Sequence, residues 1–253
     1  MTMDTVVLFL KSEYLDILVV VSVFFASFIQ GILGFGFGMI AIPAMSLVMG
    51  PKVAIPIAVI LGFCINVGLS IKLWKSISVR RFLPLISAGC LTVPLGSYLL
   101  VVLNPSFVKL ILGLIILVTS VAYFFGFKLV IKNERNGLYI TGLMSGCLSG
   151  VIGIGGPPII LFLANQNEDK LSFKANLVFY FFILGLIIIP SYMVSGLMSP
   201  EIYESSFKLW IPVFFGMISG NYTSSFVSQN VFKKMVLICL TASAIVLIWG
   251  QVF

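Results

Sequence analysis

The sequence predicts an all-α integral membrane protein with about eight membrane segments, or up to ten if half-helices are counted separately. The chain is 60% hydrophobic and only 9% charged, whereas a soluble domain carries about 25% charged residues. The apolar stretches are unbroken, without the ~10-residue alternation of barrel strands. Because backbone groups in lipid must be hydrogen-bonded internally, such stretches are expected to form helices.

Charged residues divide the chain into apolar intervals at 17–51, 53–71, 82–108, 110–127, 136–167, 175–200, 209–232 and 235–253. A membrane-spanning helix needs about 20 residues, so most intervals fit one helix each. The first and the fifth are too long for one helix and too short for two. Lys and Arg are expected in the loops between intervals, with no charged side chain deep inside any of them.

Both long intervals contain a glycine-rich run, GILGFGFGMIAIP at 31–43 and GVIGIGGPPII at 150–160. Glycine costs a helix roughly 1 kcal/mol relative to alanine, and proline about 3 kcal/mol. The runs therefore predict a broken or re-entrant helix pair in each half, near mid-membrane. Small residues three or four apart, such as Gly146 and Gly150, also allow membrane helices to pack closely, and this alternative stays open.

The two runs can be overlaid, which predicts an internal duplication within a single transmembrane domain, residues 1–253. Gly31-x-x-Gly34-x-Gly36 matches Gly150-x-x-Gly153-x-Gly155. The expected boundaries are repeat 1 at about 1–127, a linker at 128–136, and repeat 2 at about 137–253.

The distribution of Lys and Arg indicates how the repeats are oriented. The loop at 72–81 and the linker are rich in Lys and Arg, so both are expected on the cytoplasmic side. If the second glycine-rich segment crosses twice, or enters and returns, then Glu201 and Glu204 lie outside and Lys233 and Lys234 inside. Each half then has odd parity, which predicts two inverted repeats, as in many secondary transporters.

Broken helices suggest a binding site for a small anion. A helix N-terminus has unpaired N–H groups and a partial positive charge, so it accepts an anion. Two facing breaks would form a positive cradle without any charged side chain. The candidate substrate-binding residues are Gly34, Gly36, Gly153, Gly155, Gly156 and Pro157, with Gln30, Ser149 and Asn66 as polar neighbours. The alternative for each polar side chain is an interhelical hydrogen bond, worth about 0.6 kcal/mol.

Other functional classes find little support in the sequence. The chain has no histidine, the commonest metal ligand, and no metal site or cofactor is expected. The net charge of +7 is explained by loop Lys and Arg, so no nucleic-acid partner is expected. Cys64, Cys90, Cys147 and Cys239 are widely spaced without a CxxC pair, as expected of small buried apolar residues. No catalytic residue is identified, and the protein is not expected to be an enzyme.

Three stretches resemble the sulfite exporter TauE/SafE family: the first run, read as GxxGxGxGxxxxP, then PKVAIPIAVI and SGCLSGVIGIGGPPIILFL. The resemblance covers about residues 15–250. It implies a multi-spanning transporter related to proteins that move sulfite, sulfoacetate or other sulfur-containing organic anions. Gly34 and Gly36 match the family's first glycine motif, and the second is matched by Gly153, Gly155, Gly156 and Pro157.

The expected function is a secondary transporter, acting as an exporter, for a small sulfur-containing anion such as sulfite or an organosulfonate. The site and the alternating access follow from the inverted repeats, and the substrate class from the resemblance. A passive anion channel and a membrane-embedded sulfur-transfer subunit that uses a cysteine are the alternatives. The expected location is the cell (inner) membrane, as a multi-pass protein in the lipid bilayer. A coupling ion and the oligomeric state, with a homodimer as one option, are left open.

Overall fold

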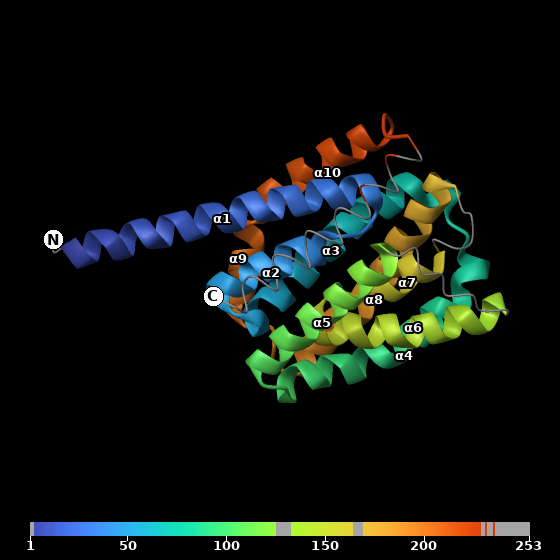
Figure 1. Ribbon diagram of the computed structural model, residues 1–253, viewed down its shortest axis with the longest axis horizontal. Helices are drawn as coiled ribbons and strands as arrows, with labels where there is room; N and C mark the ends of the chain where they lie inside the picture. The colour runs from blue at the N-terminus through green and yellow to red at the C-terminus, as the bar shows by residue number, and fades with distance from the viewer. Residues whose placement is uncertain (1–2, 125–132, 164–168, 229–230, 232–234, 236–253) are drawn as a thin grey trace.

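The computed structural model describes residues 3–124, 133–163, 169–228, 231 and 235. Within these ranges the chain is helical without strands, and its helices pack side by side in one bundle (Figure 1). The elements are α1 Met3–Leu33, α2 Phe37–Met49, α3 Pro51–Leu73, η1 Trp74–Ser76, α4 Val79–Val102, α5 Pro105–Phe124, α6 Glu134–Ile152, α7 Gly156–Leu163, α8 Lys170–Val194, α9 Pro200–Lys208 and α10 Trp210–Ser224. The N-terminal part of α1 projects beyond the other helices (Figure 1).

Two side-chain caps determine where α6 and α8 begin. Asn133 accepts hydrogen bonds from the N–H groups of Arg135 at 3.0 Å and Asn136 at 3.4 Å. This cap starts α6 inside the stretch that the sequence assigned to a linker. Asp169 caps α8 in the same way, and its hydrogen bonds with Ser172 hold the pKa of that exposed carboxyl below its usual value. Both caps pair N–H groups that the first turn of a helix leaves without partners.

Helices α3 and α8 form an antiparallel pair. In Figure 1, α3 runs from left to right and α8 from right to left. The backbone N–H of Ser78, after η1, donates to Asn176 Oδ1 in the first turns of α8 at 2.8 Å. Further along, the rings of Phe63 and Phe182 stack at a centroid distance of 5.8 Å. Glycine at 185 permits this contact, since a Cβ there would lie 2.5 Å from the ring of Phe63.

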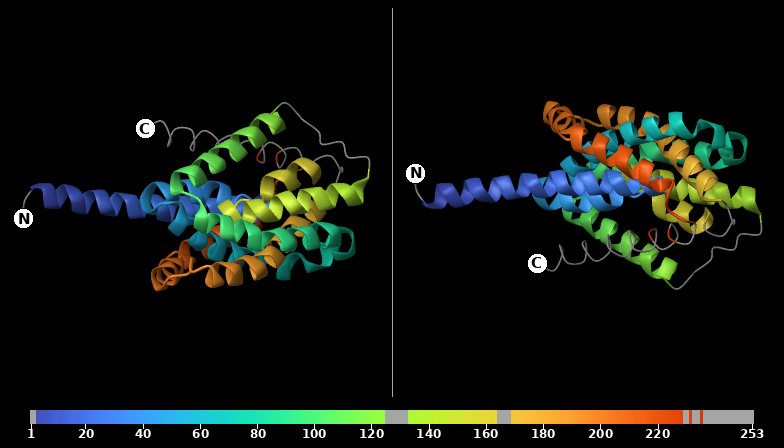
Figure 2. Two further views of the ribbon diagram at one scale, coloured as in Figure 1. Left: turned by 90° about the horizontal axis from the view of Figure 1, so that it is seen from below. Right: turned by 90° about the horizontal axis from the view of Figure 1, so that it is seen from above.

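The most extensive helix contacts are made by α4 with α6 and by α1 with α10. Both pairs have glycines at the contact. In the first pair a Cβ at Gly142 or Gly146 would collide with the backbone of α4, and one at Gly150 would lie 2.5 Å from Val93 O. In the second pair, a Cβ at Gly216 or Gly220 would likewise collide with the backbone of α1. Helix α10 lies along α1 in Figure 1 and in the right-hand view of Figure 2. Glycine thus permits backbone-to-backbone packing, as small residues commonly do in membranes.

Three of the described helices are long and apolar enough to cross a membrane, judged by length and composition: Pro51–Ser76, Val79–Val102 and Lys170–Val194. Shorter apolar helices lie at Ile17–Leu33, Phe37–Met49 and Pro105–Ile115. The all-helical, apolar architecture agrees with the sequence-based expectation of a membrane protein. The number of spans stays a prediction, and the last predicted interval, 235–253, lies almost wholly outside the described residues.

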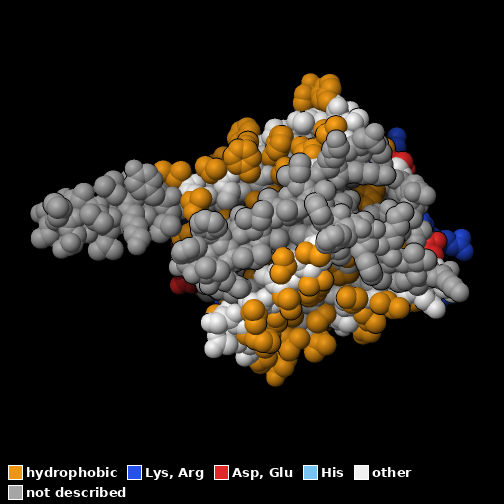
Figure 3. Space-filling model, in the orientation of Figure 1, with side chains coloured by type: hydrophobic (Ala, Val, Ile, Leu, Met, Phe, Trp, Pro, Cys, Tyr) orange, Lys and Arg blue, Asp and Glu red, His pale blue; other side chains and the backbone are white. Residues whose placement is uncertain are grey.

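Large apolar side chains cover much of the outer surface. Leu91 on α4, Val194 on α8 and Phe207 on α9 are among the most exposed. Figure 3 shows orange side chains over the upper and lower edges of the bundle, with the blue and red ones gathered mainly at the right-hand end. Soluble monomers rarely expose apolar patches of this extent, whereas lipid-facing helices require them.

We predict that Gly146→Leu destabilises the contact between α4 and α6. A Cβ at this position would meet the carbonyl oxygen of Gly89 and the hydroxyl of Thr92, so the helices must separate. Overpacking of this kind costs about 1–3 kcal/mol or more, which should lower the melting temperature of the purified protein in detergent. The matched control is Met144→Leu on the exposed face of α6. Equal melting temperatures for the two variants would contradict the close packing.

Candidate functional site

The first glycine-rich run interrupts the chain between α1 and α2. α1 ends at Leu33, and α2 begins at Phe37. Gly34 has a φ of 84° and Gly36 a φ of 107°, in the left-handed region that residues with a Cβ rarely adopt. The N–H of Gly34 still donates to Gln30 O at 2.7 Å. The helix therefore stops for three residues and restarts within the bundle.

The second run interrupts the chain between α6 and α7. Gly153 has a φ of 69°, and its N–H donates to Ser149 O at 3.1 Å. The hydroxyl of Ser145 donates to Gly155 O at 2.6 Å. This bond pairs one carbonyl oxygen of the interruption, which would otherwise be unsatisfied at depth in the bundle.

The two interruptions differ in the backbone donors they can offer. In the first turn of α2, Phe37, Gly38 and Met39 all carry an N–H. In α7 the first turn contains Pro157 and Pro158, and proline has no N–H to donate. The first turn of α2 can therefore offer more backbone N–H donors to a ligand than the first turn of α7.

The helix that follows the first interruption touches the second interruption. A Cβ at Gly38, in the first turn of α2, would lie 2.8 Å from Gly153 O in the second interruption. On the other side, a Cβ at Gly153 would lie 2.7 Å from Ile42 Cδ1 of α2. Segments far apart in the sequence thus meet through their backbones, and glycine at both positions allows it.

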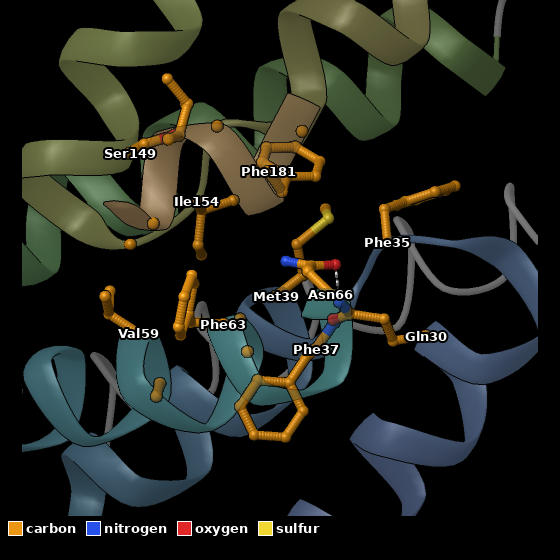
Figure 4. A pocket seen from close by; sticks show the side chains of 18 of the residues that line it. Gln30, Phe35, Phe37, Met39, Val59, Phe63, Asn66, Ser149, Ile154 and Phe181 are labelled. Atoms are coloured by element: carbon orange, nitrogen blue, oxygen red, sulfur yellow. Dashed lines mark hydrogen bonds between the residues drawn. The ribbon is translucent and has the colours of Figure 1, made fainter. Parts of the chain in front are cut away.

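A cavity lies where the interruptions meet α3 and α8. The centres of water-sized molecules can occupy about 80 Å³ of it, whereas a single water needs about 10–15 Å³ measured in this way. A small anion with part of its hydration shell would fit. Its lining comes from the end of α1, the first turn of α2, the middle of α3, the second interruption and the middle of α8 (Figure 4).

Most of the residues predicted from the sequence line this cavity: Gln30, Gly36, Asn66, Ser149, Gly153, Gly155 and Gly156. Gly34 and Pro157 are not part of the lining. Gly34 instead packs against the side chain of Lys174, where a Cβ would lie 2.8 Å from Cγ. Gly34 and Pro157 instead contribute to the backbone path. The positive φ of Gly34 turns the chain after α1, and Pro157 lies in the first turn of α7, where proline is tolerated.

Gln30 and Asn66 form a polar chain that begins at α2. The side-chain oxygen of Gln30 accepts a hydrogen bond from the N–H of Phe37 at 3.2 Å. Its amide nitrogen donates to Asn66 Oδ1 at 2.8 Å. With its oxygen held by Gln30, Asn66 directs its amide nitrogen toward the cavity (Figure 4). The side-chain oxygen of Asn66 is thus occupied by Gln30, and its side-chain NH₂ remains available to a ligand in the cavity.

Ser149 lies on the opposite side of the cavity from Gln30 and Asn66 (Figure 4). The residue is only 3% exposed, and its hydroxyl has no hydrogen-bond partner among the described residues. A Cβ at Gly155 would collide with this hydroxyl. A buried hydroxyl without a partner costs about 1–3 kcal/mol, so a ligand that accepts from it would relieve that cost.

The remaining walls are apolar. Phe63 and Val59 of α3, Ile154 of the second interruption and Phe181 of α8 surround the polar groups (Figure 4). No charged side chain is found among the described residues that line the cavity. In such surroundings, hydrogen bonds to a ligand are stronger than in water.

Lys174 contradicts the expectation that Lys and Arg lie in loops. It belongs to α8, is only 2% exposed, and donates to Gly31 O and to Asn221 Oδ1, the latter at 3.0 Å. The sequence reading missed it because it treated each lysine as a break between spans. Asp169 provides the missing signal, since an N-cap at that position starts the helix before Lys174.

Lys174 pairs one of the carbonyl oxygens at the C-terminal end of α1. A helix leaves its last four C=O groups without intrahelical partners. Here Gln30 O accepts from Gly34, Gly31 O from Lys174, and Ile32 O from the hydroxyl of Ser224 at 3.0 Å. A positive charge is also favourable at a helix C-terminus. The first interruption is thus held by α8 and α10.

The cysteines and possible metal ligands do not form a site in the described part of the chain. Cys64, Cys90 and Cys147 are free thiols on three different helices, and none of them lines the cavity. Cys239 lies outside the described residues. No group of His, Cys, Asp or Glu that could hold a metal ion is found among the residues searched.

We predict that Lys174→Met lowers the melting temperature of the detergent-purified protein. Methionine keeps the apolar stem but leaves Gly31 O and Asn221 Oδ1 without their donor, at about 1–3 kcal/mol. Lys208→Met is the control, because the side chain of Lys208 is exposed on α9. A melting temperature that stays equal or rises in Lys174→Met would show that burying the charge outweighs its hydrogen bonds.

Comparison with known proteins identifies the family. The model of the sulfite exporter TauE/SafE family matches residues 19–247 of the chain. No curated protein and no solved structure matches it. The matched range includes both interruptions, the cavity and the contacts that hold the end of α1. This chain therefore belongs to the sulfite exporter TauE/SafE family of membrane transporters.

Proposed function

We propose that this chain is a secondary transporter that exports a small sulfur-containing anion, such as sulfite or an organosulfonate, through the cell (inner) membrane. The anion is held in the cavity where the two helix interruptions meet. The observation that carries this proposal is the composition of the cavity: hydrogen-bond donors on two sides, apolar walls, and no charged side chain among its described lining residues.

The donors suit the oxygens of a sulfite or sulfonate group. These oxygens are acceptors. The amide nitrogen of Asn66 faces the cavity (Figure 4), and the lining also includes Ser149, whose unpaired hydroxyl is buried against Gly155. The N-terminal turn of α2 adds backbone N–H groups and the positive end of the helix dipole. Because the anion meets dipoles rather than a fixed cation, it can be bound and released without breaking an ion pair.

The pairing of helices supports two inverted halves. Overlaying the glycine runs makes α1 equivalent to α6 and α3 equivalent to α8. In the same overlay α10 corresponds to α4. The contact of α4 with α6 and the contact of α1 with α10 are then equivalent contacts with the two halves exchanged. α3 and α8 run in opposite directions (Figure 1), as equivalent helices of inverted repeats must. Rocking one half against the other would expose the cavity to each side in turn.

We predict that the purified protein in liposomes transports radiolabelled sulfite or an organosulfonate with saturable kinetics, and that Gly155→Leu abolishes this transport. A Cβ at 155 would collide with the hydroxyl of Ser149 and lie 2.6 Å from Ser145 O, so the side chain would push the second interruption away from α6. The control is Gly196→Leu, which adds the same side chain where nothing lies within 4 Å. Gly196 has a positive φ that Gly155 lacks, so this control carries the greater backbone strain without disturbing the second interruption. The melting temperature of each variant reports whether it is folded.

The outcomes of this experiment separate the candidate functions. Flux that rises without saturation would indicate a passive anion channel. Transport that survives in a folded Gly155→Leu protein would exclude a binding role for the second interruption. Full activity in a variant without its four cysteines would exclude the sulfur-transfer alternative, and loss of activity would favour it. Of the three cysteines that the structure describes, none lines the cavity.

We further predict that Ser149→Ala weakens transport without destabilising the protein. The hydroxyl has no partner within the described residues, so its removal should leave the melting temperature unchanged or raise it. A hydrogen bond to a charged ligand is worth about 1.5–3 kcal/mol, which predicts a rise in the KM for the anion of at least about tenfold.

Ser46→Ala is the matched control for Ser149→Ala. The hydroxyl of Ser46 on α2 is also buried without a partner, but Ser46 does not line the cavity. The melting temperature of this variant should change as little as that of Ser149→Ala, and its KM should equal that of the wild type. An equal KM in both variants would remove Ser149 from the binding site.

A further inference from the structure

A second pocket lies between the N-terminal ends of α4 and α6, away from the central cavity. Its described lining consists of Arg80, Arg81, Leu83, Pro84, Ser87, Glu134, Arg135, Leu138 and Tyr139. It encloses about 1040 Å³ of empty space, including its open side. It shares no residue with the cavity proposed to hold the transported anion.

This pocket has an excess of positive charge. Three arginines line it together with one carboxylate, and Arg81 Nε pairs with Glu134 Oε1 at 2.6 Å. No ion pair is recorded for Arg80 or Arg135 within the described residues. The N-termini of two helices point their positive dipole ends at the same place. Cations in the first turn of a helix are unfavourable, so an anion bound here would stabilise both helix ends.

Apolar side chains continue from the pocket along both helices. On α4, the exposed leucines Leu83, Leu91 and Leu95 share one face, and on α6 Tyr139 and Leu143 are exposed next to each other. In Figure 3 the charged side chains gather at the right-hand end, where α6 begins, and apolar ones follow along the lower edge, over α4. The surface therefore changes from basic to apolar along the direction of the helices.

We propose that this pocket binds the phosphate headgroup of an anionic phospholipid, whose acyl chains lie along the exposed faces of α4 and α6. Guanidinium groups recognise phosphate oxygens through paired hydrogen bonds, and basic pockets between membrane helices on the cytoplasmic side bind such headgroups. Arg80 and Arg135 contact the phosphate, while Glu134 holds Arg81 in place. Tyr139 lies at the rim, a position that aromatic residues favour at the membrane interface.

A lipid fits this pocket better than a soluble phosphate compound. A soluble anion would use only the arginines and would leave the adjoining apolar faces without a role. A phospholipid matches both the charge and the exposed leucines. The bound lipid would also bridge α4 of the first half and α6 of the second, at the end of their glycine-lined contact.

The test measures binding to the full-length protein in detergent after removal of native lipid. We expect phosphatidylglycerol to raise the melting temperature and to remain bound in native mass spectrometry. Phosphatidylcholine and inorganic phosphate at the same concentrations should do neither. Each Arg near a membrane surface contributes on the order of a fivefold gain in affinity for anionic lipid, so Arg80→Gln and Arg135→Gln should each weaken binding by about that factor.

Lys208→Gln is the charge-matched control, because Lys208 lies on α9 outside the pocket. This variant should bind phosphatidylglycerol like the wild type. Equal binding of phosphatidylcholine, or unchanged phosphatidylglycerol binding in both arginine variants, would overturn the proposal. Stabilisation by inorganic phosphate equal to that by the lipid would assign the pocket to a soluble anion instead. None of these readouts depends on transport, so they are independent of the proposed function.

Discussion

A peptide group that loses its helical hydrogen bond inside a membrane must find another partner, and this constraint governs the centre of the molecule. The first interruption leaves carbonyl oxygens at the end of α1, which Gly34, Lys174 and Ser224 satisfy. It also leaves N–H groups at the start of α2, and the side chain of Gln30 takes only one of them. Three of the last four carbonyl oxygens of α1 are thus paired by protein, while N–H donors remain in the first turn of α2, which lines the cavity. That imbalance suits an anionic solute.

Glycine has three separate roles in this chain. At Gly146 and Gly150 it allows α6 to pack on the backbone of α4. At Gly34, Gly36 and Gly153 it permits a positive φ. At Gly155 it leaves space for the hydroxyl of Ser149. Close packing and helix interruption, the two explanations that the sequence left open, therefore both apply. Within the second run, Gly150 serves close packing and Gly153 the interruption.

Composition was enough to predict an all-helical membrane protein, and glycine and proline content pointed to the segments that meet at the cavity. Gln30, Asn66 and Ser149 could be selected because polar side chains are rare in such segments. The role of Lys174 could not, because its burial depends on contacts with Gly31 and Asn221 from distant helices. The start of α6 within the predicted linker depends on a local cap at Asn133, which a count of charges does not detect.

The paired prolines of α7 make the two interruptions chemically unequal, although their sequences can be overlaid. Pro157 and Pro158 leave two positions in the first turn of α7 without an amide donor, whereas the first turn of α2 contains no proline and Gln30 occupies only one of its N–H groups. An anion between them would be held more firmly by the first half of the chain than by the second. In the proposed alternating access, the anion would therefore remain bound to the first half while the second half moves away from it, so the two duplicated halves would have different roles in transport.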